Sequence, residues 1–398
     1  MYNPGPQSSS KSIYTLQFWL LCASSFLFFA SFNIIIPELP AYLEKLGGAE
    51  YKGLIISLFT FTAMISRPFS GKFTDNIGRI PVMIFGAMVC FVLGFIYPMV
   101  TTVVGFFVLR LVHGFSTGFK PTGTVAYVAD IIPFNRRGEA MGISGMFGTF
   151  GMAAGLGIGS LIKIYFSIDI LFYTSSVLAI LSIIILIGME ETLPNSQKLN
   201  WSHLKVKKHE IIDMSVLEPC IVMFCTVFSL GVVLTIIPDL SVHLGIENKG
   251  LFFAVFTVAS VLVRVIAGKI SDKYGRERVL LVASLLYAAG MLVVGMADSV
   301  TVLLVGAVLF GLGTGMNSPT IFAWTADLCR EENRGKAMAT VFIALEFGIM
   351  LGAIVSGYTY NNDPANFTIT FLIAAFIALI AFAYLIIKLA AKRQYTNK

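Results

Sequence analysis

Apolar residues dominate this chain in runs of about 20 residues, the length that a helix needs to cross a bilayer. The pattern predicts twelve spanning helices, and most connections between them are short, so successive spans are expected to run antiparallel. The predicted spans lie near residues 14–37, 51–70, 80–100, 102–128, 138–162, 167–189, 215–238, 249–268, 278–297, 299–325, 335–358 and 366–388.

One connection, residues 190–214, is long and charged enough to join two bundles. We therefore expect an all-α integral membrane fold of two six-helix bundles. The first would cover residues 1–190, a cytoplasmic linker 191–214 and the second bundle 215–398. The polar N-terminus is followed by no Ala-x-Ala-like cleavage sequence, which predicts a retained first span rather than a signal peptide.

The composition agrees with a membrane protein. Hydrophobic residues make up 57% of the 398 residues and charged residues 13%, whereas soluble domains carry roughly 25% charged residues. The mean hydropathy is +0.83. These values exclude soluble enzymes, disordered scaffolds and nucleic-acid binders. The five cysteines show no CxxC or paired spacing, so neither a disulfide framework nor a metal site is expected.

The basic residues predict the orientation. With both termini cytoplasmic, 20 of the 28 Lys and Arg residues fall on the inner side, 4 outside and 4 within spans. Cytoplasmic loops retain Lys and Arg, so we expect cytoplasmic N- and C-termini. The short termini and compact loops are typical of a multi-pass protein of a bacterial inner cell membrane.

The chain also repeats itself at an offset of 197 residues. The segment GLIISLFTFTAMISRPFSGKFTDNIGR (53–79) matches GLFFAVFTVASVLVRVIAGKISDKYGR (250–276), and a second match joins residues 114–138 to 311–335. A constant offset over two separated stretches indicates duplication. Two six-span halves in the same orientation are a known plan of secondary transporters.

These residues resemble the major facilitator superfamily over essentially the whole chain. The stretch G-K-F-T-D-N-I-G-R (71–79) is similar to the family signature G-x-x-x-D-x-x-G-R, and it recurs as G-K-I-S-D-K-Y-G-R (268–276). Residues 110–114 (R-L-V-H-G) resemble a second signature. Residues 142–159 resemble the glycine-rich signature of the drug:proton antiporter branch, with Leu156 in place of proline and Ser160 in place of the final glycine.

The signature loop is expected to turn sharply at the cytoplasmic surface, which favours glycine at both ends. Its acid could face the positive end of a helix dipole. The resemblance implies that Asp75 faces the start of span eleven, that Arg79 pairs with Asp130, and that these contacts close the cytoplasmic side. The alternative is a basic loop that only sets topology. The predicted gate residues are Gly71, Asp75, Gly78, Arg79, Asp130, Gly268, Asp272, Gly275 and Arg276.

Span four places polar residues on one helical face, because Arg110, His113, Thr117, Lys120 and Thr124 are spaced by 3 or 4. A lone cation at mid-bilayer costs at least about 2.5–3.5 kcal/mol, so we expect this face to line a wet cavity. The resemblance implies the same. The alternatives are that Arg110 only braces neighbouring helices, that His113 is a packed neutral imidazole and that Lys120 snorkels.

Glu346 is the only acid well inside a predicted span. Burial disfavours the charged form of a carboxyl group, as a proton carrier requires. The alternative is a structural carboxylate between helices. Asn33 and Asn317 are candidate hydrogen-bonding partners of a substrate. Glu38 and Asp239 follow matched Ile-Pro pairs and are expected to face external water at an outer gate.

Gly151, Gly155 and Gly159 form a small-xxx-small ridge, which usually means close helix packing. In the antiporter signature, the resemblance implies that this packing also governs leak.

Three other classes of membrane protein, namely primary pumps, membrane enzymes and channels, lack their characteristic motifs in this sequence. The sequence has no P-loop for a primary pump, no HExxH-like set for a membrane enzyme and no multisubunit selectivity ring. We therefore expect a non-enzymatic secondary transporter that works by alternating access. The leading hypothesis is that Glu346, with Arg110 or His113, exchanges an inward proton for an outward solute. The rivals are a proton-coupled importer of an organic anion or sugar and a non-transporting sensor.

Three basic groups against one acid should disfavour polycations. We expect a small amphiphilic, neutral-to-anionic solute or drug. The other expected partners are protons and the lipid bilayer, with no nucleic acid. We also expect a functional monomer with no cofactor, driven by a proton gradient.

Overall fold

The structure is a computed structural model and describes residues 14–133, 136–194, 212–329 and 334–396. The described residues form helices and no strand. Twelve of the helices have 18 residues or more: α1 (Leu16–Asn33), α3 (Lys52–Asn76), α4 (Arg79–Ile96), α5 (Val103–Ile131), α6 (Arg137–Tyr165), α7 (Ile168–Ile187), α8 (Leu217–His243), α9 (Leu251–Tyr274), α10 (Arg276–Gly295), α11 (Val300–Leu328), α12 (Arg334–Tyr360) and α13 (Phe367–Thr396). A short helix, α2 (Leu39–Lys45), follows α1 after the 3₁₀ turn Ile36–Glu38.

Ten helical stretches in the described part of the chain are long and apolar enough to cross a membrane, and α9 gives an eleventh if its two parts, bent by 45°, count as one span. Helix α5 does not pass this test. Its central residues carry the polar face with Arg110, His113 and Lys120, which lowers its mean hydropathy although these side chains are buried.

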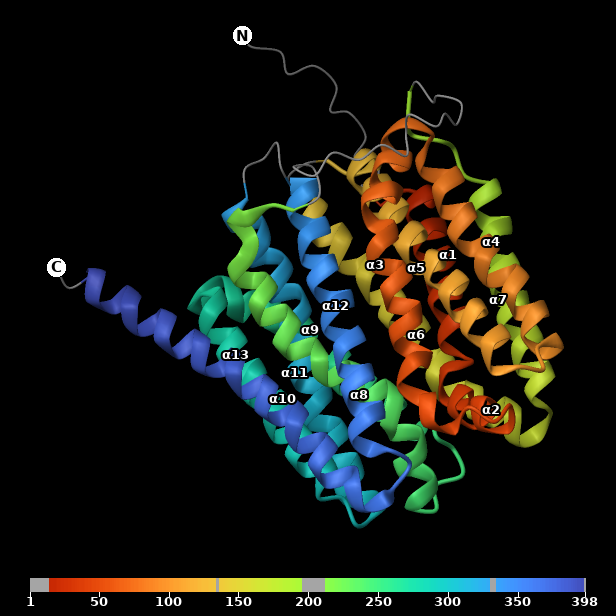
Figure 1. Cartoon of the computed structure of the whole chain (residues 1–398). Coiled ribbons are helices and arrows are strands. Elements are labelled where there is room, and N and C mark those ends of the chain that lie inside the picture. Colours follow the sequence, from red (N-terminus) through yellow and green to blue (C-terminus); the bar gives the residue numbers. More distant parts are fainter. Residues whose placement is uncertain (1–13, 134–135, 195–211, 330–333, 397–398) are drawn as a thin grey trace, which may run out of the picture.

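The long helices form two groups that lie side by side, α1–α7 and α8–α13 (Figure 1). Within the first group, α1 packs against α6 and α7, and α5 against α3 and α4. The second group repeats this arrangement, with α8 against α12 and α13, and α11 against α9 and α10. The halves meet mainly where α3 packs against α12 and α6 against α9.

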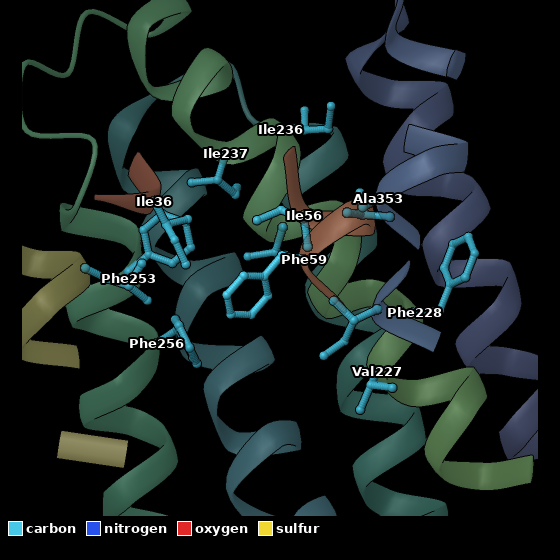
Figure 2. Close-up of a cluster of buried hydrophobic side chains, with 14 of the residues drawn as sticks. Ile36, Ile56, Phe59, Val227, Phe228, Ile236, Ile237, Phe253, Phe256 and Ala353 are labelled. Atoms are coloured by element: carbon cyan, nitrogen blue, oxygen red, sulfur yellow. The ribbon is translucent and has the colours of Figure 1, made fainter. Parts of the chain in front are cut away.

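An apolar cluster joins the two halves at the end of the molecule away from the signature loops. We call this end the outer end and the end that carries the signature loops the inner end. Figure 2 shows Ile36, Ile56 and Phe59 of the first half beside side chains of the second, including those of Ile237 and Phe256. All five are buried. Burial of apolar surface stabilises a contact by about 25 cal/mol per Å² when it is removed from water, so this cluster favours closure at the outer end.

The contacts between the halves end before the inner side is reached. A side chain at Gly53 of α3 would meet Ala353 O of α12 at 2.5 Å, and one at Gly250 would meet Leu156 O of α6 at 2.2 Å. Towards the opposite ends of the same helices, open space surrounds the glycines, with no neighbouring atom within 4 Å. These are Gly71, Gly142, Gly145 and Gly268. The molecule is therefore closed on the outer side and open on the inner side.

Candidate functional site

Two ion pairs cross between the halves at the outer end. Lys249 Nζ lies 2.9 Å from Glu38 Oε2, and Lys52 Nζ lies 2.6 Å from Asp239 Oδ2. Ser160 also donates to Glu38 Oε1 at 2.8 Å. We call Glu38–Lys249 and Lys52–Asp239 the outer ion pairs.

The outer ion pairs are related by the internal repeat. Lys52 and Lys249 begin the matched Lys-Gly-Leu segments, and both acids follow Ile-Pro. Each half therefore offers one base and one acid, and each base reaches the acid of the other half. The expectation that Glu38 and Asp239 face external water is wrong, since Glu38 is only 2% exposed and the Asp239 side chain 16%. A buried carboxylate requires a charged or hydrogen-bonded partner, and spacing alone could not reveal one on the other half.

A third ion pair crosses the interface at mid-depth. Arg67 Nη2 of α3 donates to Glu346 Oε1 of α12 at 2.9 Å, and the guanidinium carbon of Arg67 lies 4.6 Å from the ring centroid of Phe342. Both charged side chains are 7% exposed. The sequence pattern indicated Glu346 but not its partner Arg67. The available signal was the repeat, in which Arg67 and Arg264 are matched basic residues inside predicted spans.

The repeat places a second contact at the same depth on the other side of the interface. Arg264 Nη1 of α9 donates to Thr149 Oγ1 of α6 at 2.8 Å. Thr149 occupies the position that matches Glu346, at the same offset of 197 residues. One side of the interface therefore joins arginine to a carboxylate, and the other joins arginine to a hydroxyl.

The polar face of α5 lies inside the first half rather than on an open cavity. Arg110 is 1% exposed, donates through Nε to Ile55 O at 2.7 Å and contacts the Tyr97 hydroxyl at 3.4 Å. Its guanidinium carbon lies 4.7 Å from the ring centroid of Phe59. Arg110 thus braces α3 and α5 and the 3₁₀ turn after α4.

His113 and Lys120 are buried on the same face, each 1% exposed. His113 Nδ1 lies 3.2 Å from the Tyr97 hydroxyl. The Lys120 ammonium lies 5.0 Å from the ring centroid of Phe28 on α1. Among the described residues, neither His113 Nε2 nor Lys120 Nζ has a hydrogen-bond partner. The expectation that this face meets water is wrong for this conformation, while a role in transport stays a prediction.

The two candidate asparagines make contacts within their own halves. Asn33 Nδ2 donates to Phe29 O of the same helix at 2.7 Å. Asn317 Nδ2 donates to the Thr226 hydroxyl at 2.9 Å, and Asn317 Oδ1 has no hydrogen-bond partner among the described residues. Asn317 therefore keeps a free acceptor, whereas the amide of Asn33 is engaged locally.

The signature loops hold the inner ends of each half. Arg79 Nε lies 2.9 Å from Asp130 Oδ2, and Arg276 Nε lies 2.9 Å from Asp327 Oδ2 in the second half. The pairing of Arg79 with Asp130 that the resemblance implies is thus present. Asp272 is paired with Arg276 in the same way that Asp75 is paired with Arg79.

Asp75 is paired within its own half in this conformation. Its side chain is 74% exposed and lies 3.6 Å from Arg79 Nη1, within its own half. The side chains at residues 334 and 335, which begin span eleven, lie outside those that the structure describes, so the contact expected there stays a prediction.

The glycines of the loop have different roles from those expected. Gly71 and Gly268 lie within α3 and α9 and do not form the turn. The turn requires the later glycines, because φ is +137° at Gly78 and +93° at Gly275, a region that disfavours side chains. Glu191, which spacing did not indicate, accepts hydrogen bonds from the backbone N–H groups that begin α4.

The glycine ridge of α6 packs directly on the backbone of α1. A side chain at Gly151, Gly155 or Gly159 would lie 2.0–2.6 Å from a carbonyl oxygen of α1 or of Ile34, the residue that follows it. The second half repeats the arrangement, since Gly348 and Gly352 of α12 pack on carbonyls of α8. The prediction of close helix packing is confirmed. Because both halves share it, the ridge by itself does not indicate antiport.

No cluster of three or more His, Cys, Asp or Glu side chains in the described ranges could hold a metal ion. The five cysteines are unpaired thiols. The expectation of a transporter without cofactor stays a prediction.

Known proteins with similar sequences are transporters. The family model described as Major Facilitator Superfamily matches residues 21–213 and 219–398. Multidrug resistance protein 2 of Bacillus subtilis is 26% identical over 381 residues, covering 91% of this chain and 92% of the relative. The multi-drug resistance efflux pump PmrA of Streptococcus pneumoniae is 28% identical over 380 residues, covering 89% and 92%.

The fold is also that of a solved transporter. The crystal structure of the human organic anion transporter MFSD10 (TETRAN) has a TM-score of 0.72 and 18% identity, and the match covers 92% of this chain and 98% of that one. The family model extends over nearly the whole chain, and the duplicated halves, the two signature loops and the paired interface agree with it. The chain belongs to the major facilitator superfamily, a family of multi-pass membrane transport proteins.

Proposed function

We propose that this protein exports a small amphiphilic, neutral-to-anionic solute or drug by alternating access, in exchange for protons. The observation that carries the proposal is the reciprocal interface between the halves. Charged pairs cross it at the outer end and at mid-depth, while the inner ends are apart. Such an interface can separate on one side as it closes on the other.

The names of the relatives support the direction of transport. A multidrug resistance protein and an efflux pump match this chain over about nine-tenths of its length. Import of an organic anion or sugar is the alternative that the test must distinguish.

In this proposal, the proton acts on the Arg67–Glu346 pair. A protonated Glu346 is neutral and loses its charge-assisted bond to Arg67, which weakens the contact between α3 and α12. An incoming proton would therefore favour separation of the halves at mid-depth. Arg110 and His113 would act from inside the first half by positioning α3, which carries Arg67.

The proposal includes the finer topology. All twelve long helices would span the membrane. Helix α5 could do so despite its polar face, because neighbouring helices cover that face and keep it away from lipid. The two termini would lie in the cytoplasm of a bacterial cell, and the open inner side would face it. The functional unit would be a monomer without cofactor, driven by the proton gradient across the inner membrane.

The test uses purified protein in liposomes that contain a pH-sensitive dye. Solutes from three classes, namely anions, zwitterions and lipophilic cations, are added on the side that corresponds to the cytoplasm. We expect proton movement opposite to the solute. Movement of protons and solute in the same direction would replace export with uptake. No movement with any class would contradict proton-coupled transport of these solutes.

A further inference from the structure

The two mid-depth contacts differ in charge although the repeat makes them equivalent in position. Arg67 meets a carboxylate, so its pair with Glu346 is neutral overall. Arg264 meets the hydroxyl of Thr149, so this pair carries one positive charge. The duplicated chain therefore has a charge asymmetry at the centre of its interface.

The described neighbours of Arg264 supply no carboxylate to balance it. The acids on α9 and on the helices packed against it are engaged at the inner ends, where Asp327 and Asp272 pair with Arg276, Glu277 pairs with Lys392 and Glu139 pairs with Arg136. The titratable neighbour that interacts with Arg264 is Tyr287, a phenol.

The donors of Arg264 are also incompletely used. A guanidinium has five N–H donors in a planar fork that matches a carboxylate or phosphate. One of them reaches Thr149, and the buried Nε has no hydrogen-bond partner in the described part of the chain. A buried cationic donor without a partner is costly, and a charged group inside a membrane protein usually marks a pathway or a ligand site.

The site can be reached from the inner side. Arg264 is ten residues from the inner end of α9 at Tyr274, which places it about 15 Å from that end. Arg264 and Thr149 are both partly exposed. On the inner side of Thr149, Gly145 and Gly142 of α6 are exposed and have open space beside them.

We propose that Arg264, held by Thr149, binds the anionic group of the transported solute, and that the absence of a carboxylate at position 149 gives the protein its preference for anions over cations. This inference names the selectivity site of the export function proposed above, and rests on it. The ligand group is a carboxylate or another planar oxyanion that can accept two hydrogen bonds from one guanidinium.

The sharpest test transfers the other side of the interface onto this one. Thr149→Glu would place a carboxylate opposite Arg264, as Glu346 lies opposite Arg67. Thr149→Gln is the matched control, because glutamine has nearly the same size as glutamate and carries no charge. Arg264→Gln removes the cation itself and keeps the proposal testable if Thr149→Glu does not fold. Each variant is first checked for a single species by size exclusion.

Binding is measured by isothermal titration calorimetry with the protein in detergent. The probes are naphthylacetate, the neutral naphthylacetamide and the cation naphthylethylammonium. We expect the unaltered protein to prefer the carboxylate. Thr149→Glu and Arg264→Gln should weaken carboxylate binding about 10-fold to 100-fold, the range for a lost hydrogen bond to a charged group. Thr149→Gln should change it by less than about 3-fold, since the cation stays unneutralised.

Equal carboxylate binding by Thr149→Glu and Thr149→Gln would overturn the proposal, as would an unaltered protein that prefers the cation or the amide. The result is independent of the direction of transport. Loss of binding in Thr149→Glu without any proton-coupled export would leave the anion site standing and remove the proposed function. Proton-coupled export that is unaffected by Thr149→Glu would leave the proposed function standing and remove the anion site.

Discussion

Buried charges in this protein differ in what surrounds them, and the difference sets their expected roles. Glu346 and Arg67 satisfy each other across the interface at 2.9 Å. Arg110 is satisfied within one half by a backbone carbonyl. Lys120 has an aromatic ring near its ammonium and no hydrogen-bond partner among the described residues. Removal of one partner of a buried ion pair leaves an uncompensated charge, whereas removal of an unpaired charge does not.

The first prediction concerns Glu346→Gln. The variant should lose proton-driven flux and retain exchange of solute for solute, because the amide of glutamine cannot take up a proton in place of the carboxylate. It should also lose stability by about 3–5 kcal/mol, since Arg67 keeps its buried charge. Proteoliposome flux and thermal unfolding measure the two effects. The double variant Arg67→Gln/Glu346→Gln is the control and should recover stability but not coupling. Proton-driven flux that survives in Glu346→Gln would make this carboxylate structural.

The second prediction compares two cations of α5. Lys120→Met should leave the thermal midpoint unchanged or raise it, because an ammonium without a hydrogen-bond partner is replaced by an apolar chain of similar length. Arg110→Met should lower the midpoint, since it removes the charge-assisted bond from Arg110 Nε to Ile55 O and the contact of the guanidinium with the Phe59 ring. Thermal unfolding in detergent checks both. A clear loss of stability in Lys120→Met would mean that the ammonium has a partner not visible in this conformation.

At the scale of helices, close approach of backbones holds each half together. The glycine ridge of α6 lies on carbonyls of α1, and Gly348 and Gly352 of α12 lie on carbonyls of α8 in the same way. Small residues allow such packing where lipid supplies no hydrophobic driving force between helices. At Gly142, by contrast, α6 has open space beside it and no described atom of a neighbouring helix within 4 Å of an added side-chain carbon.

The third prediction tests this packing. Gly155→Ala should destabilise the protein by about 1–3 kcal/mol, the usual effect of overpacking, because the added carbon would lie 2.6 Å from Ala30 O. Gly352→Ala, its counterpart in the second half, should behave in the same way. Gly142→Ala is the matched control on α6 and should be neutral or stabilising by about 0.5–1 kcal/mol. Thermal unfolding separates them. Equal midpoints for Gly155→Ala and Gly142→Ala would contradict close packing at the ridge.

At the scale of the whole molecule, the repeat makes the interface nearly symmetric. Each outer ion pair takes its base from one half and its acid from the other. The apolar cluster shown in Figure 2 lies at the same end. Together they favour the outer-closed state over the outer-open one, so the balance between states should respond to the ion pairs.

The fourth prediction follows from this balance. Asp239→Lys places two cations together at Lys52 and should shift the population towards the outer-open state. The double variant Lys52→Asp/Asp239→Lys restores opposite charges and should return it. Spin labels at Glu50→Cys and Glu247→Cys, both exposed and on different halves, report the outer distance by double electron–electron resonance. Cys329→Ser removes the cysteine that is not buried.

The expected result is a longer distance in Asp239→Lys than in the unaltered protein, and a restored distance in the charge-exchanged variant. Unchanged distances in Asp239→Lys would show that the apolar cluster and the Glu38–Lys249 pair hold the outer side closed without the Lys52–Asp239 pair.

The sequence by itself determined the helices, their grouping by the repeat and the family. These properties depend on local order along the chain: runs of about 20 apolar residues, a constant offset of 197 residues and the spacing within the signature loops. The turn at Gly78, the pair Arg79–Asp130 and the packing of the glycine ridge agree with that prediction. Helical spacing also placed Arg110, His113 and Lys120 on one face.

Only the tertiary structure decided what each face meets. Spacing within a helix identifies which residues share a face, but not which helix lies opposite, because that depends on packing between segments far apart in the chain. Arg67 and Glu346 are 279 residues apart, and Lys249 and Glu38 are 211 residues apart. For the same reason, the α5 face turned out to be internal. The match of Thr149 with Glu346 is present in the sequence, but its meaning depends on Arg264 lying beside it.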